Sequence, residues 1–318
     1  MTEPRRPVVF VLDDIHPAAL EHLAANADLR RPADSANWRE EAEGLIVRST
    51  RVTGDDIRAA KRLKVVGKHG AGIDNIDSTA AAECGVAVRH TPGVNAPSVA
   101  DLAVGMALAL LRNLARHTDA LRQGTRLSGP EKTGYELGEL TAGIVGVGAI
   151  GSLVAKRLVG GFDAKVVGYD PYLENWPAGV TPVPTLDALI EAADIIFLHV
   201  PLNDETRNMF DAAALARMKP GSYLVNCARG GIVDEAALAD ALRSGHIRGS
   251  ASDVFVSEPK FESPLLEIDG FIATPHAGAQ TEASLRRVGI AIADKVLNCL
   301  TEPAPAGAVA EVAKGGPQ

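Results

Sequence analysis

Residues 141–170 read TAGIVGVGAIGSLVAKRLVGGFDAKVVGYD, which is the pattern of a strand, a glycine-rich turn, a helix and a second strand. Residues 142–147 and 165–169 are short apolar runs, and residues 150–158 carry apolar side chains at helical intervals. Between the first strand and the helix, Gly146, Gly148 and Gly151 have the spacing G-x-G-x-x-G. This order predicts a βαβ unit that binds a dinucleotide.

Each residue type in this stretch has a separate task. Gly146 permits the tight turn, Gly148 lets the backbone approach a pyrophosphate, and Gly151 lets the helix pack closely on the strand. Free N–H groups at the start of the helix favour phosphate. Asp170 ends the second strand, where a carboxylate accepts hydrogen bonds from the adenosine ribose and repels a 2′-phosphate. The sequence therefore predicts NAD rather than NADP, and the alternative is a glycine-rich turn without a ligand.

Length and composition limit the remaining possibilities. A chain of 318 residues predicts one to three domains, and 46% hydrophobic with 23% charged residues is ordinary for a globular protein. The net charge of −8 and the lack of a Lys/Arg stripe argue against a nucleic-acid partner. Cys84, Cys227 and Cys299 have no metal-ligand spacing, so we expect no metal site and a reducing cytoplasm. The apolar run 8–12 is too short for a signal peptide, and no run is long enough for a bilayer, so we expect no membrane partner.

The first 98 residues alternate between short β-branched runs and Ala-rich segments. We expect strands at 8–12, 45–47, 65–66 and 86–88 and helices at 17–26, 55–60 and 78–84. This alternation predicts a parallel sheet with helices on both faces. Because the region has no G-x-G-x-x-G of its own, it is expected to be a separate α/β domain that does not carry the dinucleotide.

The rest of the chain has the same alternation. A long helix is expected at about 98–122, with Ser98 as its N-cap and Asp101 completing a variant capping box, followed by an extended arm at 124–138. Further strands are expected at 195–200, 223–226, 250–254 and 271–273, and helices at 186–191, 211–216, 235–244 and 281–300. The Pro/Gly/Ala-rich tail 301–318 is expected to be partly disordered.

Three strand ends carry reactive side chains. They are Arg229 in NCARGG (226–231), Glu258 in DVFVSEP (253–259) and His276 in TPHAG (274–278). In an open parallel sheet, ligands bind outside the carboxyl ends of the strands. Each residue alone is compatible with a surface charge, a turn cap or a structural histidine, but three successive strand ends predict a cation, a carboxylate and an imidazole beside the dinucleotide.

These motifs together resemble the D-isomer-specific 2-hydroxyacid dehydrogenases, over residues 44–290 and in that family's order. The matching stretches are LIVRST (45–50), VVGKHGAGIDNID (65–77), NAPSVADLAVGMALALLR (95–112), GIVGVGAIG (143–151), GYDPY (168–172), HVPLNDETRNMF (199–210), NCARGGIVDEAAL (226–238), ASDVF (251–255) and TPHAGAQT (274–281). The resemblance implies an α/β fold of two doubly wound parallel-sheet domains, with the active site in the cleft between them. A flavodoxin-like substrate domain would comprise 1–98, a Rossmann NAD-binding domain 99–283, and a helix and tail at 284–318 would return to the substrate domain.

The resemblance also implies catalytic roles. Arg229 would hold the carboxylate and keto oxygen of the substrate. His276 would be the acid/base, protonating the keto oxygen during reduction. Glu258 would hydrogen-bond the far ring nitrogen, fix its tautomer and favour the imidazolium. This is coherent chemistry, because hydride addition to a carbonyl creates an alkoxide that needs a proton and a nearby positive charge.

Coenzyme contacts are implied in the same way. The backbone of the glycine-rich turn would meet the pyrophosphate, Asp170 the ribose and Asp253 the nicotinamide amide. Ala149 stands where the family often has Arg, Lys or Ser, which removes one side-chain contact to phosphate and leaves the backbone cradle. Cys227 could alternatively be a nucleophile, but nothing near it in sequence activates it. The full predicted set is Gly146, Gly148, Ala149, Ile150, Gly151, Asp170, Thr206, Cys227, Ala228, Asp253 and Gly278.

On the substrate side, Gly70, Ala71 and Gly72 would offer backbone N–H groups to the substrate carboxylate. Arg48 and Lys68 are expected to bind a second anionic group such as phosphate, and the alternative is a solvated surface pair. His69 stands where phosphoglycerate dehydrogenases usually carry a small residue, and His199 is expected to be structural or to line the coenzyme site.

The predicted function is an NAD-dependent dehydrogenase acting on a small 2-hydroxy or 2-keto acid, with 3-phosphoglycerate as one candidate. Alternatives are a hydroxypyruvate/glyoxylate or sulfolactate-type reductase, and a non-catalytic NAD-binding protein like the corepressors that share the fold and these three side chains. Formate dehydrogenases carry Gln where Glu258 stands, which disfavours that subgroup.

The chain stops where some phosphoglycerate dehydrogenases add a regulatory domain, so serine feedback through such a domain is not expected. The long helix and the arm resemble the family's dimer-forming elements, which implies a homodimer.

Overall fold

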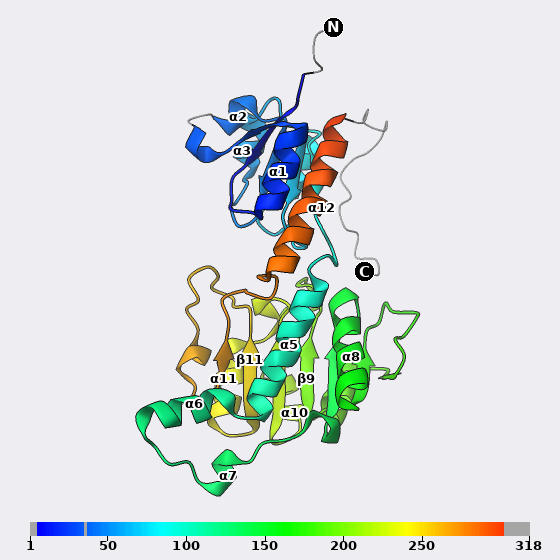
Figure 1. The fold of residues 1–318 in the computed structure, drawn as a ribbon. Helices are drawn as coiled ribbons and strands as arrows, with labels where there is room; N and C mark the ends of the chain where they lie inside the picture. Colours follow the sequence, from blue (N-terminus) through cyan, green and yellow to red (C-terminus); the bar gives the residue numbers. More distant parts are fainter. Residues whose placement is uncertain (1–4, 35–36, 302–318) are drawn as a thin grey trace. The chain divides into compact units, whose positions relative to one another are not determined.

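The computed structural model describes residues 5–34 and 37–301, which form two compact units (Figure 1). The first unit contains residues 5–95 and 280–301, and the second contains residues 96–279. The tail for which we expect disorder lies outside the described residues, apart from Thr301.

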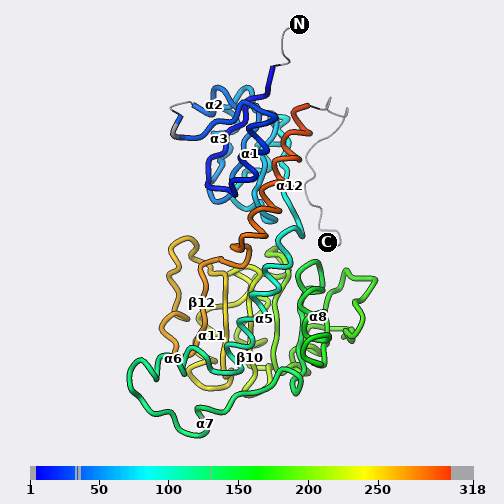
Figure 2. The backbone as a smooth tube through the Cα atoms, viewed as in Figure 1, coloured from blue at the N-terminus to red at the C-terminus, as the bar shows by residue number. Residues whose placement is uncertain are grey.

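The first unit is built on a parallel five-stranded sheet in the order β2-β1-β3-β4-β5, the order of flavodoxin-like folds. Its helices α1 and α12 pack on one face and α2, α3 and α4 on the other; Figure 2 follows α12 alongside α1. Val9 and Val11 are buried toward α12, and Phe10 is buried toward the opposite face. The strands are β1 (Val8–Val11), β2 (Asp28–Arg30), β3 (Gly44–Val47), β4 (Val65–Lys68) and β5 (Ala87–Arg89), and the helices are α1 (Pro17–Asn26), η1 (Pro32–Asp34), α2 (Trp38–Glu41), α3 (Gly54–Ala59), α4 (Ser78–Glu83) and α12 (Glu282–Thr301).

The second unit is built on a parallel seven-stranded sheet in the order β12-β11-β10-β9-β6-β7-β8, which contains the Rossmann arrangement. Helices α5 and α8 cover one face, and α9, α10 and α11 cover the other. The strands are β6 (Thr141–Val145), β7 (Lys165–Tyr169), β8 (Val180–Pro182), β9 (Ile195–Leu198), β10 (Ser222–Asn226), β11 (Ile247–Ser252) and β12 (Ile272–Ala273). The helices are α5 (Ala96–Leu111), α6 (Leu114–Gln123), α7 (Gly129–Lys132), η2 (Leu137–Glu139), α8 (Ala149–Phe162), α9 (Leu186–Ala192), α10 (Ala212–Arg217), η3 (Gly230–Ile232), α11 (Glu235–Arg243) and η4 (Pro264–Glu267). The predicted fold class, two doubly wound parallel sheets, is confirmed.

The predicted helix at 98–122 is wrong in two respects. It is two helices, α5 and α6, bent by 55° at Asn113, whose backbone is left-handed with φ 50°. One residue in this conformation ends the helical hydrogen-bond ladder, and Asn adopts it more readily than most residues. Ser98 is not the N-cap, because α5 begins at Ala96 and Ser98 is buried inside it.

Other differences concern short elements. The arm at 124–138 is not fully extended, since it contains α7 and η2. The edge strands β2 and β8 and the short helix α2 were not expected from the sequence. Among the described residues, no single helix is long and apolar enough to cross a membrane, although the bent pair α5 and α6 meets that test together.

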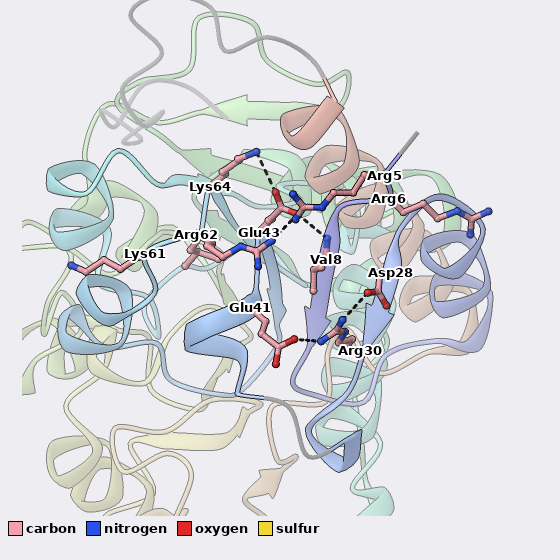
Figure 3. A pocket seen from close by; sticks show the side chains of 11 residues that line it. Arg5, Arg6, Val8, Asp28, Arg30, Glu41, Glu43, Lys61, Arg62 and Lys64 are labelled. Carbon is pink, nitrogen blue, oxygen red and sulfur yellow. Dashed lines mark hydrogen bonds and ion pairs between the residues drawn. The ribbon is translucent and has the colours of Figure 1, made fainter. Parts of the chain in front are cut away.

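A cluster of ion pairs lies at the amino-terminal ends of the strands of the five-stranded sheet. It borders an open cavity of about 870 Å³ (Figure 3). The half-buried carboxylate of Glu43 pairs with Arg5 at 3.0 Å and Lys64 at 3.5 Å, and accepts the N–H of Val8 at 3.2 Å. Burial alone would raise the pKa of Glu43, but the hydrogen bond from Val8 and the charges of Arg5 and Lys64 lower it below its ordinary value. Because a carboxylate already occupies its centre, we assign this cluster a structural role, tying the starts of β1, β3 and β4 together.

Candidate active site

The glycine-rich turn between β6 and α8 has the close packing that its sequence predicts. Gly146 has φ +85°, and a Cβ there would lie 2.8 Å from the carbonyl carbon and oxygen of His199. A Cβ on Gly151 would lie 2.1 Å from the carbonyl oxygen of Gly146, so any larger residue pushes α8 away from the turn. Gly148 is the N-cap of α8 and has no side chain, so no side-chain oxygen caps the first-turn N–H groups. This turn fits a phosphate group.

Asp170 follows β7 directly and braces the same turn. Its Oδ2 accepts the N–H of Val147 at 3.0 Å, and its Oδ1 accepts the N–H of Tyr172 at 3.1 Å. An ionised carboxylate can accept about four hydrogen bonds, so acceptor positions remain for ribose hydroxyl groups.

Arg229, Glu258 and His276 follow β10, β11 and β12, which are neighbours at one side of the seven-stranded sheet. Parallel strands present their carboxyl ends at one edge, so the three loops that carry these residues start side by side. The three strand ends are therefore neighbours in the sheet, and the placement of their side chains beside a dinucleotide stays a prediction.

His276 and Glu258 form a direct pair. The Nδ1 of His276 lies 2.7 Å from the Oε2 of Glu258, and the other carboxylate oxygen accepts the N–H of Phe255 at 2.9 Å. Burial alone would raise the pKa of Glu258, but these two hydrogen bonds and the positive charges of His276 and Arg229 lower it. Because an ionised carboxylate only accepts, Nδ1 carries the proton and Nε2 is left for other chemistry.

Arg229 is held at the end of β10 by its own turn. Asn226 accepts the N–H of Ala228 and donates to the carbonyl of Arg229, both at 3.0 Å. The guanidinium donates to the carbonyl of Ala228 at 2.7 Å, and its charge acts on Glu258. Asn226 was not among the predicted site residues, although it stands in the quoted NCARGG motif.

Four other predicted coenzyme residues are buried or hydrogen-bonded within the second unit. The hydroxyl of Thr206 closes the turn 201–206, lying 2.5 Å from the carbonyl of Pro201, and Ala228 and Gly278 are buried. Cys227 is buried 3.8 Å from the sulfur of Met106. Burial, together with the charge of Asp253, raises the pKa of the Cys227 thiol, which keeps it protonated and argues against the nucleophile alternative.

His199, whose carbonyl lies beside Gly146 of the glycine-rich turn, has a neutral side-chain ring. Both ring nitrogens are buried without a hydrogen-bond partner among the described residues. Burial lowers the pKa of His199 to about 3, so the ring carries no charge at neutral pH.

In the first unit, Arg48 directly follows β3 and Lys68 is the last residue of the neighbouring strand β4. The ammonium of Lys68 donates to the carbonyl of Arg48 and, at 2.7 Å, to Asn75. Asp13 fixes the loop after β3 by accepting the N–H groups of Arg48 at 2.6 Å and Thr50 at 3.1 Å. Burial would raise the pKa of Asp13, and these hydrogen bonds lower it. Asp13 was not among the predicted site residues, although its position, two residues after the end of β1, marks it as a strand-end carboxylate.

The loop 70–72 presents N–H groups. Gly70 has φ +138°, and its carbonyl accepts from Thr91, whereas the carbonyl of Ala71 contacts the ring of His90 at 2.6 Å. Within the described part of this unit, the N–H groups of Gly70, Ala71 and Gly72 donate to no protein acceptor. This arrangement can receive a carboxylate.

His69 directly precedes this loop. Its ring is buried, and burial together with the charges of Arg48 and Lys68 lowers its pKa to about 4. The ring is therefore neutral at pH 7.

No group of three His, Cys, Asp or Glu side chains that could hold a metal ion occurs among residues 5–34 and 37–301.

Comparison with known proteins places this geometry in a family. Residues 104–278 match the model of the D-isomer specific 2-hydroxyacid dehydrogenase NAD binding domain. The chain belongs to this family. The match covers most of the second unit, which holds the glycine-rich turn and the three strand-end residues, so the predicted family and its NAD-type coenzyme domain are confirmed.

Relatives of this dehydrogenase family differ in length. The chain is 42% identical over 265 residues to a D-3-phosphoglycerate dehydrogenase of Methanocaldococcus jannaschii, covering 82% of this chain but 50% of the relative. It is 43% identical over 260 residues to a hydroxypyruvate reductase of Thermotoga maritima, covering 80% and 84% respectively. The structure of a D-lactate dehydrogenase from Aquifex aeolicus with NAD and lactic acid superposes with a TM-score of 0.80 at 28% identity, covering 92% and 95%. The chain thus spans about half the length of the archaeal phosphoglycerate dehydrogenase and most of the length of the other two.

Proposed function

We propose that this protein is an NAD-dependent 2-hydroxyacid dehydrogenase that transfers hydride between NAD(H) and a small 2-hydroxy or 2-keto acid. The observation that carries the proposal is the 2.7 Å pair of His276 and Glu258 at the ends of neighbouring strands of a Rossmann sheet. A histidine whose Nδ1–H is fixed by a carboxylate presents Nε2 as an acid/base.

The chemistry divides between coenzyme and protein. When bound, NADH would supply the hydride that reduces the keto carbon. His276 holds a proton on Nε2 and delivers it to the keto oxygen, while Glu258 stabilises the protonated ring through Nδ1. Arg229 binds the substrate carboxylate and polarises the keto oxygen, since its charge already acts on this site. In the oxidation direction, His276 takes the proton from the hydroxyl group.

The coenzyme site in this proposal is the turn between β6 and α8. The backbone of Gly148, Ala149 and Ile150 would hold the pyrophosphate, and Asp170 would hold the ribose, both supported by the fit described above. Thr206, Cys227, Ala228 and Gly278 would line the site through backbone and apolar contacts.

Substrate choice is proposed from the first unit. The N–H groups of Gly70 to Gly72 would bind the substrate carboxylate, and Arg48 and Lys68 would bind a second anion, as a phosphorylated acid would require. The alternatives are hydroxypyruvate, glyoxylate and sulfopyruvate. Replacing Arg48 and Lys68 by Gln should raise KM for phosphohydroxypyruvate far more than for glyoxylate, and equal effects on both would reject the phosphate assignment.

NADH oxidation with phosphohydroxypyruvate, hydroxypyruvate, glyoxylate and sulfopyruvate tests the activity. We expect one of them to be reduced, and His276→Ala to lose that turnover while still binding NADH. A His276→Ala protein that turns over at the wild-type rate would overturn the mechanism. Coenzyme binding without turnover of any keto acid would instead favour the non-catalytic corepressor-like alternative.

We also propose a cytoplasmic homodimer. Leu114 and Leu121 on α6 are 52% and 82% exposed, and Tyr135 in the following arm is 38% exposed, so α6 and the arm together offer apolar surface that a second copy could cover. Gel filtration that gives the mass of a monomer would reject the dimer.

A further inference from the structure

The turn that carries His276 is fastened by two buried polar side chains that lie far from it in the sequence. Asp253, at the end of β11, is 2% exposed, and Ser98, in the first turn of α5, is 5% exposed. Buried polar groups are retained where they make hydrogen bonds, so their partners show what they hold.

Asp253 accepts most of the hydrogen bonds that the turn donates. Its Oδ1 accepts the hydroxyl of Thr274 at 2.5 Å and the N–H of Ala277 at 2.6 Å, and its Oδ2 accepts the N–H of Gly278 at 2.8 Å. Its backbone carbonyl accepts the N–H of His276 itself, also at 2.8 Å. One residue therefore binds donors on both sides of His276.

Ser98 fastens the far end of the turn. Its hydroxyl donates to the carbonyl of Gly278 at 2.6 Å. Gly278 is thus held through its N–H by Asp253 and through its carbonyl by Ser98, and α5 becomes connected to the turn. The contact explains why Ser98 is buried inside α5 instead of capping it.

These contacts hold a backbone that is unfavourable on its own. His276 has φ 52°, in the left-handed region that residues other than glycine rarely adopt. Such a conformation persists only where the surroundings fix it, and it is found where a side chain must be aimed. Glu258 restrains the ring of His276, whereas Asp253 and Ser98 restrain the backbone that carries it.

We propose that Asp253, Ser98 and Thr274 are positioning residues that set the direction of the His276 imidazole. This inference rests on the proposed role of His276 as acid/base. Three of about four acceptor positions on the Asp253 carboxylate are used by the turn, which leaves one for the nicotinamide amide. Holding the turn is therefore the main task of this carboxylate, and any coenzyme contact is additional.

The first test uses Thr274, because two substitutions separate shape from hydrogen bonding. Thr274→Val keeps the shape but removes the donor to Asp253, whereas Thr274→Ser keeps the donor. We expect Thr274→Val to lower kcat about tenfold, since a small misplacement of a catalytic group has effects of this size or larger. NADH affinity should change less than twofold, and Thr274→Ser should restore kcat.

The second test compares two buried serines of the same unit. Ser98→Ala and Ser250→Ala each remove a buried hydroxyl that donates to a carbonyl, in the case of Ser250 that of Leu224 at 2.9 Å. Both should lower the Tm by similar amounts. Only Ser98→Ala should lower kcat, again about tenfold, and Ser98→Thr should recover part of it.

A readout that is independent of turnover separates this inference from the proposed function. The imidazole NMR signals of His276, identified by their absence in His276→Gln, should shift in Thr274→Val and Ser98→Ala but not in Ser250→Ala. Failure of the wild type to oxidise NADH with any keto acid would overturn the proposed function, and the NMR shifts would still support the positioning. Unchanged signals and unchanged kcat in Thr274→Val and Ser98→Ala would overturn the positioning role.

Discussion

A matched pair of glycines in α8 tests how the coenzyme turn is built. Gly151, at the start of the helix, faces the turn, and a Cβ there would lie 2.1 Å from the carbonyl oxygen and 3.1 Å from the carbonyl carbon of Gly146. Gly160, near the end of the same helix, is exposed, and a Cβ there meets no atom within 4 Å. Alanine at either position adds the same methyl group, so the difference between the two variants measures the surroundings alone.

The two substitutions are expected to change the free energy of unfolding in opposite directions. In Gly151→Ala the added methyl group would clash with backbone atoms of Gly146, so α8 must shift. Such overpacking lowers the free energy of unfolding by about 1–3 kcal/mol. Gly160→Ala replaces a flexible helical residue at no steric cost and should stabilise by roughly 0.5–1 kcal/mol. For a domain of 150–250 residues, each kcal/mol shifts the Tm by about 2–4 °C, so the two variants should differ by at least several degrees.

Differential scanning calorimetry and NADH titration by fluorescence provide the measurement. Gly151→Ala should lower the Tm of the second unit and weaken NADH binding, because in the proposed coenzyme site the displaced helix would no longer aim its first N–H groups at the pyrophosphate. Gly160→Ala should keep the wild-type affinity and raise the Tm. Equal Tm values and equal NADH affinities for both variants would refute the close approach of α8 to the turn.

Three further predictions concern charged groups. Glu258→Gln should lower kcat for keto-acid reduction by about a hundredfold, because the protonated ring of His276 loses its carboxylate partner; steady-state kinetics with unchanged kcat would contradict this role. Asp170→Ser should raise kcat/KM with NADPH relative to NADH at least about tenfold, since an interaction of about 1.4 kcal/mol corresponds to a factor of ten, and an unchanged coenzyme ratio would speak against repulsion of the 2′-phosphate by Asp170. Glu43 has a lowered pKa in the folded protein, so its stabilisation is present above its ordinary value of 4.5 and is lost as the pH falls through the lowered pKa. The Tm of the wild type should accordingly drop more between pH 6 and pH 3 than that of Glu43→Gln, and parallel pH curves would show that Glu43 contributes no pH-dependent stability.

The parts of the site that could be predicted from sequence are those set by local chemistry. The glycines of the βαβ turn are needed wherever a helix approaches a strand end closely, so their spacing identifies the turn without a structure. Arg229, Glu258 and His276 could be grouped because parallel strands present their carboxyl ends at a common edge, and the β10-β11-β12 order makes them neighbours.

The parts that could not be predicted depend on partners distant in sequence. The apolar pattern continues through Asn113, so nothing local shows that its left-handed backbone divides the helix, held by contacts to the carbonyls of Glu131 and Thr133. Ser98 followed by Asp101 has the local pattern of a capping box, and only the arrival of Gly278 at hydrogen-bond distance reveals its actual partner. The edge strands β2 and β8 have three residues each, which is too short for periodicity to detect.

The discontinuous first unit has a consequence for biosynthesis. Its β-sheet comes from residues made before the whole second unit, whereas Ile292, Ala293 and Val296 of α12, which bury Val9, Ile46 and Val65, are made after it. The five strands therefore emerge from the ribosome with only α1 on this face, and the part that α12 covers stays exposed while roughly two hundred further residues are made, about 10 to 40 seconds of translation. The contiguous second unit can close its own core during this interval, so we expect it to fold first and the exposed sheet to depend on chaperones until α12 emerges.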